Sequence, residues 1–299
     1  MIEIGWLWVV FTLFAAASQT ARNAMQRELT ATLGTVGATH VRFLFGFPFA
    51  LIFLFGVMEV KGVGLPHVPS AFWPWVVGGA GAQIAATALM LSAMRERSFV
   101  VAYAYIKTEP VTVALFGLIF LGDSITPLTA IAIMIATTGV IVMSLKLGAG
   151  SAGTTRSTII GLGAGTMFAL SATSFRGAIL ALANPDFVLA ATFTATVGLV
   201  LQAAVLSLYL ALRDPQVLHN IMKAWKPSLF AGFMGAFASQ FWFLAFAITT
   251  AANVRTLALI EVLFAQAISK FIFKQPTAPR EAIGIVLVVA GVALLVWAY

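Results

Sequence analysis

The sequence predicts an all-α polytopic membrane protein whose ten transmembrane helices form two inverted five-helix repeats around a central cavity. Three observations predict this fold: the composition, the spacing of the apolar runs and the similarity of the two halves. The chain has 299 residues, of which 61% are hydrophobic and 9% are charged. Soluble domains carry about 25% charged residues, so this chain lacks the polar surface that water requires and must face lipid.

Five apolar segments fill the first half, and each is close to or above the roughly 20 residues that a helix needs to cross a bilayer. The segments span residues 4–22, 33–58, 70–94, 98–121 and 125–146. The breaks between them carry charged or turn-forming residues: Arg27-Glu28, Glu59 with Lys61-Gly62, Arg95-Glu96-Arg97 and Gly122-Asp123. No basic residue precedes the first segment, which favours a retained helix over a cleaved signal peptide.

Five further segments fill the second half. They span residues 157–182, 187–212, 225–248, 252–273 and 279–298, with breaks at Asn184-Pro185-Asp186, Arg213-Asp214-Pro215 and Gln275-Pro276. Residues 148–156, rich in Gly, Ser and Thr, indicate a flexible linker between a first repeat over 1–147 and a second over 157–299.

The two halves align when residue n is placed on residue n + 152. Glu109 then falls on Glu261, and Gly139 falls on Gly291. A repeat that crosses the membrane five times delivers the next repeat to the opposite side, so the two copies must be inverted. Inverted repeats are typical of secondary transporters, whose binding sites lie near the bilayer midplane between the repeats.

Basic residues are concentrated in the odd-numbered connections. Lys61 is the main exception, against twelve residues: Arg22, Arg27, Arg95, Arg97, Lys146, Arg156, Arg213, Lys223, Lys226, Lys270, Lys274 and Arg280. Because cytoplasmic loops carry the excess of Lys and Arg, we expect a multi-pass protein of the cell inner (plasma) membrane with both termini outward.

Several functions are not supported by the sequence. The net charge of +7 is scattered between apolar runs, so no nucleic-acid partner is expected beside the lipid bilayer. The chain has no cysteine, and it contains no Walker lysine motif, no His-Glu-x-x-His and no Gly-x-Ser-x-Gly. We therefore expect no enzyme, no cofactor and no metal site. A lipid-modifying enzyme needs a cluster of acids or histidines on one membrane face, and a channel would show flux that does not saturate.

Six ionisable residues fall within or at the edges of apolar segments, where each charge costs about 2.5–3.5 kcal/mol at a helix centre. They are His40, Arg42, Lys107, Glu109, Arg255 and Glu261. Such residues normally face a bundle interior or a water-filled cavity. Arg42 and Arg255 lie near segment ends, where we expect their side chains to snorkel to the interface.

Two roles remain open for the charged candidates. Glu109 and Glu261 either couple transport to a proton or cation or hold the structure together, and their equivalent positions favour the structural role. Lys107 either binds a substrate carboxylate or forms a buried ion pair. Lys107 and Glu109 point in opposite directions on one helix, and Tyr103 shares the face of Lys107.

The uncharged binding candidates are mainly polar or aromatic residues of the third and eighth segments. They are Gln83, Thr87, Ser239, Gln240 and Trp242. His40 of the second segment joins them; it either titrates near neutral pH or is a hydrogen-bonded interior residue. The competing interpretation is contact between helices for the polar residues and contact with lipid for Trp242.

The segment 102–144 resembles the EamA repeat of the drug/metabolite transporter superfamily. The resemblance rests on Glu109-Pro110, Leu121-Gly122-Asp123, Pro127 and Thr138-Gly139-Val140, and on Glu261 and Ala290-Gly291-Val292 in the second copy. Val262 and Gln275 depart from the pattern. The resemblance implies a ten-helix exporter with a central cavity, most similar to bacterial exporters of amino acids, including aromatic ones. It implies a small-molecule substrate, alternating access and a functional monomer; the alternative is an exchanger of phosphorylated or other anionic metabolites.

Overall fold

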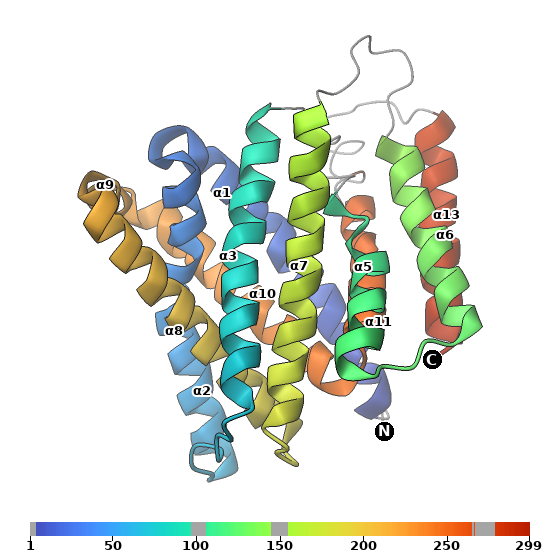
Figure 1. The fold of residues 1–299 in the computed structure, drawn as a ribbon, viewed down its shortest axis with the longest axis horizontal. Helices are drawn as coiled ribbons and strands as arrows, with labels where there is room; N and C mark the ends of the chain where they lie inside the picture. The colour runs from blue at the N-terminus through green and yellow to red at the C-terminus, as the bar shows by residue number, and fades with distance from the viewer. Residues whose placement is uncertain (1–3, 97–105, 145–154, 265, 267–278) are drawn as a thin grey trace.

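The computed structural model describes residues 4–96, 106–144, 155–264, 266 and 279–299, and the regular elements in these ranges are helices (Figure 1). In the first half, the 3₁₀ turn η1 is followed by α-helices and the π-helical η2. Their bounds are η1 Ile4–Trp6, α1 Leu7–Leu44, α2 Phe47–Lys61, α3 Phe72–Glu96, α5 Glu109–Phe116, η2 Gly117–Leu121 and α6 Pro127–Ser144.

The second half has the same order of long helices, with one short helix added. The elements are α7 Thr155–Ala181, α8 Phe187–Arg213, α9 Pro215–Lys223, α10 Trp225–Ile248, α11 Ala251–Leu257, the 3₁₀ turn η3 Ala258–Ile260 and α13 Pro279–Trp297. The linker expected at 148–156 lies outside the described residues except for its last two, because α7 begins at Thr155.

The helix α1 contains the first membrane crossing and the beginning of the second, which α2 continues. The 38 residues of α1 span about 57 Å at 1.5 Å per residue, far more than the hydrocarbon core of about 30 Å. Gly34 divides it, with φ 68° and ψ 178°. The predicted break at Arg27-Glu28 was wrong in position, because both residues lie within the helix and the chain turns at Gly34.

The long helices pair across the two halves. The helix α1 packs along α10, α3 along α7 and α6 along α13, while α2 packs against α8 and α5 against α11 (Figure 1). Adding 152 to the bounds of α6, 127 and 144, gives 279 and 296, which matches Pro279–Trp297 of α13. The same shift takes the first part of α1 onto α7 and α3 onto α10. Exchanging the halves therefore converts the α1–α10 pair into the α7–α3 pair, which confirms two inverted repeats.

The contact between α6 and α13 repeats the same symmetry in atomic detail. A Cβ atom on Gly139 would lie 2.7 Å from the backbone nitrogen of Val288, and one on Gly291 would lie 2.5 Å from that of Ala136. Since Ala136 plus 152 is Val288 and Gly139 plus 152 is Gly291, these are two copies of one contact. Small residues allow membrane helices to approach this closely.

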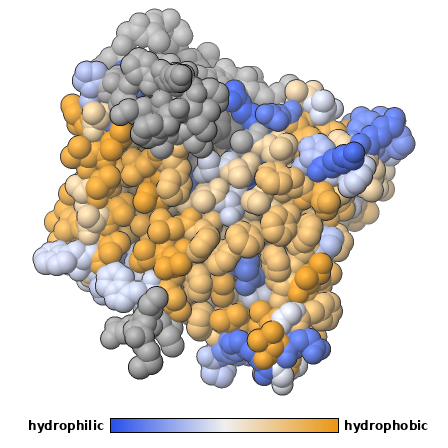
Figure 2. Space-filling model, turned by 180° about the vertical axis from the view of Figure 1, so that it is seen from behind, coloured by the Kyte–Doolittle hydropathy of each residue, from blue (hydrophilic) through white to orange (hydrophobic). Residues whose placement is uncertain are grey.

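The outer surface suits a bilayer. Five helical segments in the described residues are long and apolar enough to span: Met25–Lys61, Phe72–Ala93, Phe187–Arg213, Trp225–Ile248 and Pro279–Trp297. Figure 2 shows a broad hydrophobic belt with hydrophilic side chains mainly at its two ends. Both termini lie at one end of the molecule, beside the α2–α3 and α7–α8 connections (Figure 1).

The segment after Arg213 is a helix, although Arg213-Asp214-Pro215 was predicted only as a break. Pro215 occupies the first turn of α9, where its missing N–H leaves no hydrogen bond unmade. Ile221 is buried, and a Cβ atom on Gly37 of α1 would lie 2.8 Å from Val217. The apolar face of α9 thus packs on α1, and its other face carries the polar residues that suggested a loop.

Candidate functional site

Glu109 and Glu261 both follow an interruption of an α-helix. Glu109 begins α5 directly after a turn at Lys107–Thr108, and Glu261 follows the 3₁₀ turn η3, Ala258–Ile260. Because 107 plus 152 is 259, the two interruptions occupy equivalent places in the repeats. Backbone irregularity at membrane depth is tolerated where it is buried in protein or lines a cavity, and broken helices mark binding sites in transporters.

Each glutamate binds a cation from the opposite repeat. Lys107 Nζ lies 2.8 Å from Glu261 Oε2, and Arg255 Nε lies 3.1 Å from Glu109 Oε1. All four side chains are at most 6% exposed, so water screens neither pair. Lys107 and Glu109 were predicted to lie on one helix, but Lys107 lies in the turn before α5; each pairs with a residue of the other repeat.

A hydrogen-bonded chain extends this pairing to α1 and α10. Gln19 donates from Nε2 to Glu261 Oε1 over 3.0 Å and accepts at Oε1 from Trp242 Nε1 over 3.1 Å. The guanidinium carbon of Arg255 lies 4.6 Å from the ring centroid of Trp242 and 5.6 Å from that of Phe246. Trp242 is therefore an interior residue, and the interpretation that it contacts lipid was wrong.

A small pocket lies beside these groups. Its lining combines charged and polar side chains with an apolar wall: Gln19, Arg22, Asn23, Met90, Ile106, Lys107, Glu109, Phe168 and Arg255. The free volume is about 10 Å³, room for about one water molecule. The pocket is therefore too small for an amino acid until the groups around it move apart.

Arg22 and Arg42 add two more buried cations near the pocket. Arg22 Nη2 donates to Asn23 Oδ1 over 2.7 Å, and Arg42 Nη1 donates to Thr87 Oγ1 over 3.3 Å. Both arginines are 1% exposed, and Arg255 is 6% exposed. The expectation that Arg42 and Arg255 snorkel was wrong, because both side chains point into the bundle, where glutamate, hydroxyl and aromatic partners hold them.

The remaining polar candidates bind neighbouring helices rather than the pocket. Gln83 Oε1 accepts from Gln202 Nε2 over 2.8 Å, and His40 Nε2 lies 3.0 Å from Ser207 Oγ, both on α8. Gln240 Nε2 donates to Thr192 Oγ1 over 2.7 Å. Ser239 is buried on α10, and Tyr103 lies outside the described residues.

The sequence reasoning missed Gln19, Arg22 and Asn23. A pattern for them exists: positions 19, 22, 23 and 26 carry polar residues at intervals of three and four, which is one face of a helix. The first segment was predicted to end at Arg22, so Arg22 was assigned to a loop and the continuation of this helical face was not recognised. Polar residues along one helical face inside a membrane protein indicate an interior surface.

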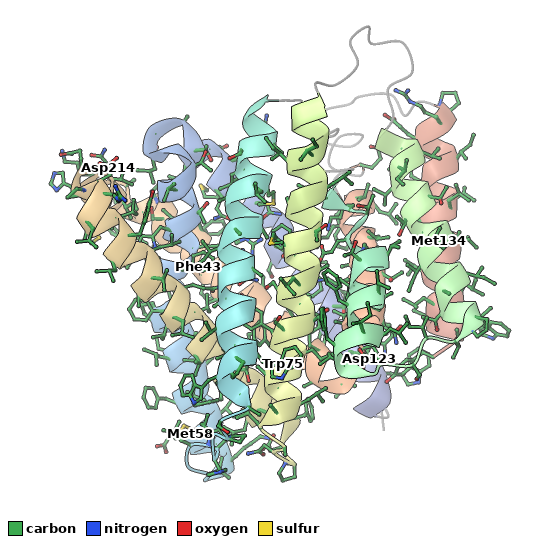
Figure 3. The ribbon with its side chains drawn as sticks, viewed as in Figure 1. Phe43, Met58, Trp75, Asp123, Met134 and Asp214 are labelled. Atoms are coloured by element: carbon green, nitrogen blue, oxygen red, sulfur yellow. The ribbon has the colours of Figure 1, made fainter. Side chains whose placement is uncertain are left out.

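Two ion pairs also join the repeats at the end of the molecule that holds the termini. Lys61 Nζ lies 2.6 Å from Asp186 Oδ2, and Arg176 Nη2 lies 3.5 Å from Asp123 Oδ1. Arg176 also donates to the carbonyl oxygens of Phe246 and Thr249. Figure 3 shows Asp123 just below α5, at the same end as Met58. These contacts hold that end of the bundle together.

Asp186 also caps α8. Its carboxylate accepts hydrogen bonds from the backbone amides of Val188 and Leu189. Burial raises the pKa of the Asp186 carboxyl, but hydrogen bonds from Lys61 and from these amides outweigh it, so the pKa lies below its usual value.

The comparisons with known proteins agree with this architecture. One solved structure that resembles it, a crystal structure, has a TM-score of 0.74 and 15% sequence identity, covering 97% of this chain and 96% of that chain. At that identity the likeness concerns the fold alone. No curated protein matches the sequence.

The sequence pattern of the EamA-like transporter family matches residues 6–145 and again 155–297. The two matches cover the two inverted repeats in turn, and the members of this family are membrane transporters and not enzymes. The chain therefore belongs to the EamA-like transporter family.

Proposed function

We propose that the protein is a secondary active transporter that exports amino acids, including aromatic ones, or related small metabolites by alternating access. One observation carries the proposal: cations and a carboxylate lie side by side in a pocket with an apolar wall. Arg22, Lys107 and Arg255 supply positive charge, Glu109 supplies negative charge, and Met90 and Phe168 are among the apolar lining residues.

An amino acid matches this arrangement because it carries both charges on one carbon atom. Its carboxylate needs a cation and its ammonium group needs a carboxylate or carbonyl acceptor, since buried charges without partners are costly. An apolar or aromatic side chain would pack on Phe168 and Met90. Buried polar groups also reject ligands that leave them unpaired, which gives the site its selectivity.

The crosswise ion pairs suit an alternating mechanism. Lys107–Glu261 and Arg255–Glu109 both connect the two repeats, so rocking one repeat against the other changes both pairs. The structural role of Glu109 and Glu261 explains the geometry without a proton, since each already has a cation. Coupling to protons is the alternative, and its signature is transport that responds to a pH gradient and to Glu109→Gln or Glu261→Gln.

A second candidate function is exchange of phosphorylated or otherwise anionic metabolites. The observation that favours it is the charge balance: among the described residues, Lys107 and Arg255 each pair with a glutamate, whereas Arg42 is buried without an ion pair to a carboxylate. A doubly charged phosphate would place its second negative charge against this additional cation, whereas a zwitterion has no second negative charge.

The location and assembly belong to the same proposal. The excess of basic residues on the odd-numbered connections supports an inner (plasma) membrane protein with both termini outward. The pocket is built from both repeats of one chain, which supports a functional monomer.

Counterflow into proteoliposomes tests the substrate. We expect labelled Phe, Thr or Met to exchange against the same unlabelled amino acid, with rates that saturate, and phosphoenolpyruvate not to compete. Absence of exchange with every amino acid overturns the preferred substrate, and competition by phosphoenolpyruvate alone selects the anionic alternative. Rates that rise linearly with concentration identify a channel.

Matched variants connect the transport to the site. Lys107→Met changes the pocket, whereas Lys61→Met removes a lysine of the exposed pair with Asp186. We expect the first variant to abolish exchange and the second to leave it near the wild-type rate. If Lys107→Met and Lys61→Met changed the exchange rate equally, transport would not depend on the proposed pocket.

A further inference from the structure

Arg42 is a buried cation without a carboxylate. It lies on the part of α1 that follows Gly34 and is 1% exposed. Its contacts are a hydrogen bond from Nη1 to Thr87 Oγ1 over 3.3 Å and its guanidinium carbon 4.8 Å from the centroid of Phe43. No ion pair joins Arg42 to Asp or Glu among the residues that the structure describes, and its Nε has no hydrogen-bond partner there.

Such a residue is costly for the folded protein. Removing a guanidinium from water carries a penalty that one neutral hydroxyl and one aromatic ring do not offset. The nearby pairs show the contrast, because Lys107 and Arg255 each have a glutamate. A buried cation in a membrane protein is a functional-site hypothesis by default, and the group that completes this one must be an anion.

The position of Arg42 connects it to the pocket. A Cβ atom on Gly235 of α10 would lie 3.5 Å from Cβ of Arg42 and 3.4 Å from Cδ of Arg22, so both arginines border the same glycine. Arg22 lines the pocket. The side chains of Arg22 and Arg42 thus lie next to each other at Gly235, with Arg22 in the pocket lining and Arg42 beside it.

We propose that Arg42, with Arg22 and the Thr87 hydroxyl, is the subsite for the carboxylate of the transported solute. The guanidinium fork of arginine matches a carboxylate in a bidentate geometry. The Thr87 hydroxyl, which accepts from Arg42 Nη1 and donates to the carbonyl oxygen of Gln83, positions that fork. Lys107 and Arg255 line the pocket but are each shared with a glutamate, so the carboxylate itself is assigned to Arg42. This assignment rests on the proposed function for the identity of the solute, while the anion site itself does not.

Binding to the purified full-length protein in detergent tests the subsite. The probes are phenylalanine, 3-phenylpropionate, which lacks the ammonium group, and phenethylamine, which lacks the carboxylate; the readout is the thermal midpoint as a function of probe concentration. For the wild type we expect stabilisation by the two carboxylates. For Arg42→Gln we expect their affinity to fall about tenfold or more, with no change for phenethylamine.

The midpoint without a probe separates binding from a structural role. Removing a buried charge that has no counter-ion should leave the midpoint of Arg42→Gln equal to or above that of the wild type. Arg42→Lys and Thr87→Val should lower the affinity for the two carboxylate probes without abolishing their binding. These two variants test the subsite if Arg42→Gln does not fold. Lys61→Gln is the control and should bind like the wild type.

The outcomes distinguish this inference from the proposed function. If the wild type exchanges phenylalanine but Arg42→Gln, or Arg42→Lys and Thr87→Val, bind both carboxylates with wild-type affinity, the subsite is wrong and the exporter stands. If phenylalanine is not exchanged but 3-phenylpropionate binding still depends on Arg42, the anion site stands and the amino-acid proposal fails.

Discussion

Glu261 holds two groups at once, Lys107 Nζ at 2.8 Å and Gln19 Nε2 at 3.0 Å, and it is 1% exposed. A buried pair of this kind contributes little when both partners are compared with apolar residues, but losing one partner leaves an uncompensated charge. The stability of a variant therefore depends on whether one partner of the Lys107–Glu261 pair is removed or both are.

A double-mutant cycle at this pair gives the first prediction. We expect Glu261→Gln and Lys107→Met each to destabilise the protein by about 3–5 kcal/mol, and the double variant to recover most of that loss. Thermal unfolding in detergent measures it. The same cycle at Lys61 and Asp186, whose side chains are 35% and 26% exposed, should show a much smaller coupling. Additive losses at Lys107 and Glu261 would contradict the buried pair.

The second prediction concerns Asp186 and pH. Its pKa is lower in the folded state than the ordinary value of 3.8, so its stabilising contribution is complete above that value and is lost as the pH falls through the folded pKa. Lys61→Met removes one of the causes. We therefore expect the difference in thermal midpoint between wild type and Lys61→Met to shrink between about pH 6 and about pH 3. A difference that grows on acidification would reverse the sign of the linkage.

The sequence located several charges within apolar segments but predicted neither their pairing nor the burial of Arg22, Arg42 and Arg255. The cost of a charge in a membrane singled out Lys107, Glu109, Arg255 and Glu261 by their positions within apolar segments. Their partners depend on which helices face each other across the repeats, and a single helix pattern does not contain that information. Arg42 and Arg255 were misjudged for the same reason, since a position near a segment end permits snorkelling only where the helix faces lipid.

At the scale of helices, Gly34 decides where the first crossing ends. Its φ of 68° and ψ of 178° lie in a region that is nearly restricted to glycine. A Cβ atom there would have no neighbour within 4 Å, so backbone conformation alone is at stake. The sequence could not separate this glycine from other helical ones, because local apolar spacing is the same on both sides of the break.

Gly34→Ala therefore gives the third prediction. We expect a loss of about 1–3 kcal/mol of stability from backbone strain, measured as the shift in thermal unfolding. Gly56→Ala in α2 is the matched control, because its Cβ atom also has no neighbour within 4 Å and its φ is not positive. It should be neutral or slightly stabilising, as alanine favours helix. Equal effects at the two positions would mean that Gly34 is not strained.

The paired glycines of α6 and α13 give the fourth prediction. Alanine at Gly139 or Gly291 would place a Cβ atom against the backbone of the other helix, so the helices must separate, at a cost of about 1–3 kcal/mol each. Because the contacts are related by the exchange of repeats, the losses should be similar. Gly81→Ala on α3, with no neighbour within 4 Å, is the control. A large loss at one glycine alone would contradict the symmetry of this contact.

The arrangement of the whole molecule as two inverted repeats was more predictable from the sequence than the contacts of single residues or the ends of single helices. The offset of 152 residues that aligned Glu109 with Glu261 also relates the helix bounds, the interrupted helices and the α6–α13 contact. An odd number of crossings then requires inversion, whatever the side chains are. What the sequence did not supply is the size of the pocket between the repeats, since that size depends on how the two repeats pack against each other.

The orientation of the whole molecule is the last prediction. Arg22 is buried, but the odd-numbered connections still carry most of the basic residues of the sequence, so we expect the α9 end to face the cytoplasm. Figure 3 places Asp214 at that end and Met58 at the opposite one. Because the chain has no cysteine, single-cysteine variants report topology directly. Ser70→Cys, beside the α2–α3 connection, should react with a membrane-impermeant maleimide on intact cells, and Gln216→Cys in α9 only after permeabilisation. Both variants should retain exchange activity, which shows that they are folded, and the reverse labelling would place the termini in the cytoplasm.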